Sequence, residues 1–106
     1  MSTYASVFRQ VLNEHPELLS QIRRGVEKES LRVTEDHATL AQTRHPPALG
    51  SALTHPAITT DYSEALLEFI TPAESSIEAT EQSLADLHRF TARQLNKELL
   101  WGASMP

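Results

Sequence analysis

Cysteine is absent from the 106 residues, which excludes a disulfide framework and a thiolate metal site. Basic residues are few, because nine lysines and arginines stand against fourteen acids and the formal charge is -5. No basic stripe is available to neutralise phosphates, so nucleic acid is not an expected partner. No apolar run approaches the roughly 20 residues of a membrane span, and the N-terminus does not have the pattern of a signal peptide. We therefore expect a cytoplasmic protein without a membrane partner.

The five histidines do not have the spacing of metal ligands, which argues against a zinc site. We interpret them as turn or surface residues. They are His15, His37, His45, His55 and His88.

The composition is that of a globular protein, with 40% hydrophobic and 22% charged residues. The length fits one small domain or a piece of a larger one. The last eight residues, 99–106, are apolar and unlike the polar tails that usually close a domain. We therefore expect residues 1–106 to be a single incomplete domain whose sequence continues beyond Pro106.

Three stretches have the periodicity of amphipathic helices. The first is predicted over residues 3–13. His15 and Pro16 end it, because proline disfavours helical geometry in the residue before it, and a short second helix is predicted over 16–20. We interpret these two as packing helices at the edge of a domain. The third is predicted over 76–96 and begins with a candidate capping box.

Residues 22–33 are predicted to form a strand, since the β-branched Val26 and Val33 favour extended backbone. Side chains alternate between the two faces of a strand, so Glu27 and Glu29 would point the same way, roughly 7 Å apart at their Cα atoms. Two acids would then face one site.

A turn is predicted over residues 34–37, where Asp36 and His37 tolerate unusual backbone angles better than most residues. The chain would return as a short antiparallel strand over 39–42. Several prolines follow, and 44–60 is predicted to be a long irregular connection of the kind that is often functional.

Residues 62–70 fit two structures. Asp61 and Glu64 match a capping box, and the apolar residues fall on one helical face, so local signals favour a helix. In a strand, Glu68 would lie in an apolar run, where an acid is rarely buried unless it is paired or binds a metal. The residues alone leave both structures open.

Several stretches, in their order and spacing, carry a resemblance to a known family. They are residues 24–32 (Arg-Gly-Val-Glu-Lys-Glu-Ser-Leu-Arg), 49–55 (Leu-Gly-Ser-Ala-Leu-Thr-His), 58–72 (ending in Leu-Glu-Phe-Ile-Thr-Pro), 86–89 (Asp-Leu-His-Arg) and 104–106 (Ser-Met-Pro). Together they resemble the N-terminal part of glutamate-cysteine ligase of the proteobacterial type. The resemblance covers nearly the whole chain.

The resemblance implies an α+β fold, the N-terminal part of a glutamine-synthetase-like fold with a curved antiparallel sheet. In such a fold residues 65–71 form a strand, so strand is the prediction there. It also implies ATP-dependent ligation of the γ-carboxyl of glutamate to the amine of cysteine, the first step of glutathione synthesis, with Mg²⁺ or Mn²⁺ as cofactor. The expected partners are these small molecules and the remainder of the ligase chain.

The resemblance also implies a metal site made by Glu27, Glu29 and Glu68. Three carboxylates on one sheet face repel each other unless a cation lies among them. Asp61 and Tyr62 look like lining for the amino-acid substrate pocket, the acid for an ammonium and the ring for an apolar wall. No separate catalytic residue is identified.

Two alternatives accompany these predictions. From the pattern alone, Glu27 and Glu29 beside several basic residues would be a solvated charged strand, and only the resemblance favours a metal site. The chain could also be a stand-alone truncated homologue that binds metal, substrate or a partner without catalysis. In either case we expect the isolated chain to be inactive as a ligase.

Overall fold

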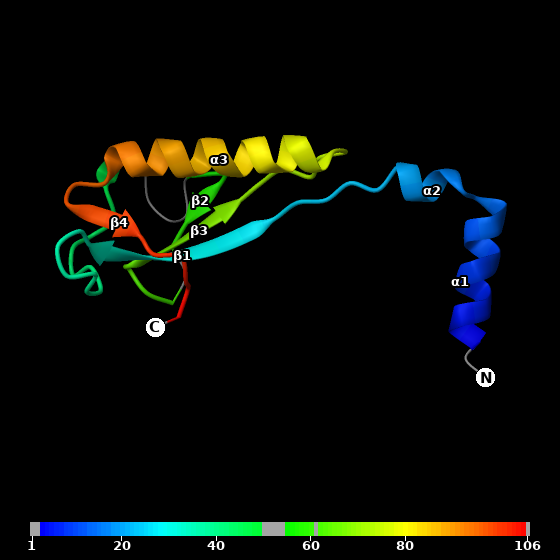
Figure 1. Cartoon of the computed structure of the whole chain (residues 1–106), viewed down its shortest axis with the longest axis horizontal. Coiled ribbons are helices and arrows are strands. Elements are labelled where there is room, and N and C mark those ends of the chain that lie inside the picture. Colours follow the sequence, from blue (N-terminus) through cyan, green and yellow to red (C-terminus); the bar gives the residue numbers. More distant parts are fainter. Residues whose placement is uncertain (1–2, 50–54, 61, 106) are drawn as a thin grey trace.

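The computed structural model describes residues 3–49, 55–60 and 62–105, and it has an antiparallel sheet covered on one face by a long helix (Figure 1). The strand order in the sheet is β2-β3-β1-β4, and each paired neighbour is antiparallel. The α+β prediction is therefore confirmed. The elements are α1 (Thr3–Glu14), α2 (Glu17–Ser20), β1 (Glu27–Thr34), the 3₁₀ turn η1 (Pro47–Leu49), β2 (Ile58–Thr59), β3 (Leu66–Ile70), α3 (Ile77–Gln94) and β4 (Glu98–Leu100).

The predicted helix over 76–96 is α3, and its first turn is capped by a side chain. Ser76 is the N-cap, and its Oγ accepts a hydrogen bond of 3.1 Å from the amide of Ala79. Such a cap stabilises a helix by about 1 kcal/mol. The cap therefore determines the residue at which α3 begins.

Helix α3 packs on one face of the sheet. Leu67 and Phe69 of β3 point to this face, and Leu84 and Leu87 of α3 pack against them. Since side chains alternate along a strand, Leu66, Glu68 and Ile70 point to the opposite face. The full cluster under the helix is Leu49, Ile58, Leu67 and Phe69, with Leu84, Leu87 and Leu100 around it.

The strand predicted over 65–71 is confirmed as β3, against the local helical signals. Strand β3 pairs with β1 on one edge and with β2 on the other. Leu66, Leu67 and Phe69 are at most 1% exposed there. Central pairing and burial on both faces therefore override the capping-box pattern before this segment.

Strand β1 begins at Glu27, five residues later than the predicted start. The preceding segment is extended, but it meets the sheet only at single points, including a bridge between Arg24 and Glu74. The Gly25 backbone passes close to residue 71, where an added Cβ would lie 3.3 Å from the carbonyl oxygen of Thr71.

The strand predicted over 39–42 is not formed, and only one isolated bridge joins Leu40 to Val33. The reason is competition for one edge of β1. Strand β3 occupies that edge up to Leu31, so little of it remains for the returning chain. The predicted turn is formed at residues 35–37, but the left-handed residue is Ala38 after it, with φ of 52°, and neither Asp36 nor His37.

Three short elements were not predicted: β4, β2 and η1. Strand β4 extends the sheet beyond β1, while β2 and η1 lie inside the stretch predicted to be irregular. Each is three residues or fewer, which is too short for a periodic pattern to show.

Helices α1 and α2 match their predicted positions, but they do not pack against the sheet. They lie at one end of the molecule, joined to β1 by the extended segment (Figure 1). Neither helix has a buried residue, so the interpretation of two packing helices is wrong for this structure. Within the described ranges, no helix is both long enough and apolar enough to cross a membrane.

Candidate functional site

The two acid-bearing strands are neighbours, and their acids share a face. Glu29 of β1 lies directly opposite Glu68 of β3, and Glu27 lies opposite Ile70. The side chains of Leu67 and Phe69 point toward α3, so Glu68 points away from it. We call the surface made by Glu27, Glu29 and Glu68 the acid face.

The spacing on the acid face follows from strand geometry. Side chains directly opposite each other in an antiparallel pair have Cβ atoms about 4.5–5.5 Å apart, and Glu27 follows Glu29 at about 7 Å. Glu27 and Glu29 are exposed, while Glu68 is half-buried. Within residues 3–49, 55–60 and 62–105, no group of three acids or histidines is arranged to hold a metal ion. The backbone therefore brings the three acids to one face without closing them into a complete cage.

The chemistry of these donors suits a hard divalent cation. Carboxylate oxygens are the ligands that Mg²⁺ and Mn²⁺ prefer, and Mg²⁺ keeps several waters while binding one or two carboxylates. Glu29 and Glu68 also place two negative charges opposite each other, an arrangement that a cation stabilises. The donors of the acid face therefore fit part of a coordination sphere.

Tyr62 lies in the segment before β3. The residue is 63% exposed, and its hydroxyl donates a 3.1 Å hydrogen bond to the carbonyl of Ser104. The same hydroxyl lies 3.5 Å from the sulfur of Met105. Tyr62 therefore contacts the C-terminal segment, and its predicted role in substrate binding stays a prediction. Asp61, predicted to bind an ammonium, lies outside the described residues.

Arg32 is a buried cation that sequence reasoning missed. It follows the acids on β1, its side chain is fully buried, and its Nη1 lies 2.7 Å from Oε2 of Glu98 on β4. Its Nη2 donates to the carbonyls of Thr43 at 2.7 Å and Glu64 at 2.9 Å. Arg32 thus joins β1, β4 and two loop segments. The available signal was an arginine between Leu31 and Val33 in a predicted strand.

Lys28 lies between the two β1 acids in sequence but points to the helix side of the sheet. Its Nζ donates to Ser30 Oγ at 2.8 Å and lies 2.9 Å from His88 Nε2. Burial lowers the pKa of Lys28, and burial together with the Lys28 charge lowers the pKa of His88. The neutral imidazole can therefore accept a hydrogen bond from the Lys28 ammonium at Nε2.

His88 also packs edge-on against Phe69, with ring centroids 4.9 Å apart. The interpretation of all histidines as turn or surface residues is therefore wrong for His88. This histidine joins α3 to both central strands beneath the acid face.

A second carboxylate, that of Glu64, joins the segment before β3 to the segment around His45. Glu64 Oε1 accepts a 2.8 Å hydrogen bond from the amide of His45 and lies 2.6 Å from the Nδ1 of its ring. These contacts, the backbone hydrogen bond first, lower the pKa of Glu64. Glu64 therefore works as a loop anchor here, and it does not cap a helix as the local pattern suggested.

A family model described as glutamate-cysteine ligase matches residues 9–106. The match starts within α1 and includes every later element of the structure. All three residues of the acid face lie inside it.

Individual relatives agree with that match. The chain is 58% identical over 95 residues to a glutamate–cysteine ligase of Photorhabdus laumondii, which covers 90% of this chain and 18% of the relative. A solved glutamate–cysteine ligase of Francisella tularensis in complex with AMP has a TM-score of 0.76 at 41% identity, covering 81% of this chain and 17% of that one. A bifunctional glutathione synthetase of Pasteurella multocida has a TM-score of 0.77 at 39% identity, covering 91% and 13%. The chain spans less than a fifth of the length of each.

Proposed function

Because the chain belongs to the glutamate-cysteine ligase family, we propose that residues 1–106 supply part of the catalytic domain of such a ligase. The complete reaction joins the γ-carboxyl of glutamate to the amine of cysteine. ATP is cleaved to ADP and phosphate, and the product is γ-glutamylcysteine, the first intermediate of glutathione synthesis. The chain contributes to this reaction only together with the remainder of a ligase.

The pairing of Glu29 with Glu68 carries the proposal. These two carboxylates, with Glu27 two residues away, would hold Mg²⁺ or Mn²⁺ on the acid face. A divalent cation held there would shield phosphate oxygens and lower the repulsion that opposes phosphoryl transfer. The contribution of the chain is to hold three acids in fixed register on two hydrogen-bonded strands.

The reaction chemistry explains why fixed acids are useful. The γ-carboxylate oxygen of glutamate attacks the terminal phosphorus of ATP, the bond from that phosphorus to the bridging oxygen breaks, and ADP leaves. The cysteine amine then attacks the acyl carbon of γ-glutamyl phosphate, losing a proton as phosphate departs. Catalysis of the first step depends on positioning and charge, since the protein supplies little covalent chemistry.

Asp61 and Tyr62 are proposed to line the amino-acid pocket. The Asp61 carboxylate would bind the substrate ammonium, and the Tyr62 ring would form an apolar wall. The exposure of Tyr62 supports this role, because 63% of the residue is accessible to a ligand.

The proposal is tested in a chimera, defined as the Photorhabdus laumondii ligase with its matched segment replaced by residues 1–106. We expect the chimera to release ADP only when glutamate, cysteine, ATP and Mg²⁺ are all present. Glu29→Gln should lower that rate by about 100-fold or more. Replacing a residue that only hydrogen-bonds to a metal ligand already lowers activity or metal affinity by about 10–100-fold. The matched control is Glu81→Gln, an exposed carboxylate on α3. Full activity in Glu29→Gln would contradict the proposed site.

A further inference from the structure

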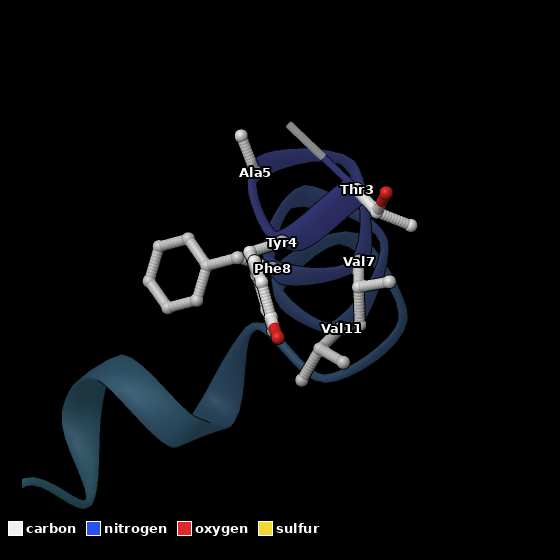
Figure 2. Close-up of a pocket in the computed structure, with 6 residues that line it drawn as sticks. All are labelled: Thr3, Tyr4, Ala5, Val7, Phe8 and Val11. Carbon is white, nitrogen blue, oxygen red and sulfur yellow. The ribbon is translucent and has the colours of Figure 1, made fainter. Parts of the chain in front are cut away.

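Helix α1 carries an apolar stripe that nothing in the described structure covers. Tyr4 is 88% exposed, Phe8 64% and Val7 53%, and Val11 completes the stripe at a spacing of three and four residues. Figure 2 shows these side chains on α1, and all four are exposed. Single exposed apolar residues are ordinary, but a contiguous patch on one helix face marks an interaction surface.

The apolar surface continues past the end of α1. Leu18 and Leu19 of α2 are 44% and 58% exposed, and Ile22 after them is also exposed. Both helices stand away from the sheet and α3 (Figure 1). A twelve-residue helix is marginal in water without packing, so α1 needs a partner to be stable. We call the exposed apolar side chains of α1 and α2, with Ile22, the arm surface.

We propose that the arm surface docks on the remainder of a glutamate-cysteine ligase, the part of the relatives that this chain does not match. This inference rests on the proposed function in taking a ligase as the occupant. The chain covers 18% of the Photorhabdus ligase and 17% of the Francisella ligase, so most of a ligase body is available to cover the arm surface. A body of that size accounts for the exposed face of α1 without a separate partner protein.

A second apolar surface favours this occupant over a second copy of the chain. Leu99 of β4 is 51% exposed, and Trp101 and Met105 after it are 39% and 66% exposed. Strand β4 is the edge strand of the sheet, and it and the C-terminal segment after it lie far from α1 (Figure 1). A dimer through α1 alone would leave them uncovered, whereas a large ligase body covers both ends.

The test compares backbone hydrogen exchange of α1 in the free chain and in the chimera. We expect α1 amides to exchange at least about 100-fold more slowly in the chimera. A free α1 exposes its amides by local fraying, whereas a docked α1 must first separate from the ligase body, which costs more free energy. Phe8→Glu should remove most of that protection in the chimera and change little in the free chain. The control is Asn13→Glu, which makes the same charge change on the opposite face of α1.

The outcomes separate docking from catalysis. Glu29→Gln in the chimera should lose activity and keep the α1 protection, so failure of one proposal does not imply failure of the other. Equal exchange of α1 in the free chain and the chimera would overturn the docking proposal. Protection of α1 in the free chain together with a dimer in sedimentation would assign the surface to a second copy instead. If the chimera is insoluble, the same exchange is measured on the chain mixed with the Photorhabdus ligase that lacks the matched segment.

Discussion

Arg32 and Glu98 form an ion pair of 2.7 Å between β1 and β4, and the Arg32 side chain is fully buried. Burying two charges costs free energy that the pair recovers only with good geometry and further hydrogen bonds. Arg32 has these from the segment after the turn, where it also donates to the Thr43 hydroxyl at 3.2 Å. The pair therefore ties the edge strand to the strand that carries two of the three acids.

Replacing Arg32 with methionine should destabilise the chain by about 3–5 kcal/mol, because the carboxylate of Glu98 is left nearly buried and uncompensated. The free energy of unfolding in urea measures this loss. Arg89→Met removes an exposed pair with Asp86 and should cost less than about 1 kcal/mol.

The double variant Arg32→Met with Glu98→Gln separates charge burial from packing. Its cost should be smaller than the sum of the two single variants by about 0.5–3 kcal/mol, since each removes the partner of the other. If the two single-variant costs simply add, Arg32 and Glu98 do not stabilise the fold through their interaction with each other.

Glu68→Gln in the chimera should raise the Mg²⁺ concentration that gives half-maximal ADP release. Loss of one negative oxygen weakens binding of a hard cation. Mn²⁺ should restore part of the rate, because it takes the same oxygen ligands while Mg²⁺ demands near-octahedral geometry. An unchanged metal dependence would remove Glu68 from the ligand set, and Glu81→Gln again serves as control.

Stability should fall as the pH drops below about 6.5, the ordinary pKa of histidine, in part because of His88. Burial and the nearby Lys28 ammonium lower the pKa of His88 in the folded chain. The unfolded chain then takes up the proton first, so acid favours unfolding. The Lys28 ammonium lies 2.9 Å from Nε2 of the ring, and the neutral ring of Phe69 packs against it.

The measurement is the midpoint of thermal unfolding between pH 7.5 and 5. His88→Asn should flatten this dependence, whereas His15→Asn, at an exposed position after α1, should leave it unchanged. An identical slope in wild type and His88→Asn would mean that other groups cause the acid sensitivity.

Residues 1–106 alone should release no measurable ADP with glutamate, cysteine, ATP and Mg²⁺. The acid face has three carboxylates but no closed metal cage among the described residues, and the chain covers only 18% of the Photorhabdus ligase. A coupled ADP assay checks this, with the chimera as positive control. Robust turnover by the isolated chain would show that a complete site lies within it.

The sequence predicted the helices well, because their periodicity and caps are local. Ser76 and the stripe of α3 needed no distant partner to be recognised. Strand β3 required the family resemblance, since its local pattern favours a helix and only pairing with β1 and β2 decides otherwise.

The site was predictable only in part, because some of its geometry is local and the rest depends on pairing between distant strands. Alternation alone put Glu27 and Glu29 on one face, but placing Glu29 opposite Glu68 depends on a register that no local signal contains. Arg32, Lys28 and His88 were missed because their partners lie far away in the sequence.

The register of β1 and β3 also bears on how the chain folds. Glu29 and Glu68 meet only after the long connection between their strands has closed, and loop closure costs conformational entropy before any contact rewards it. During synthesis the first two acids leave the ribosome well before the third. The acid face therefore forms only in the non-local step of folding, and a metal ion bound to it would favour the folded chain by mass action.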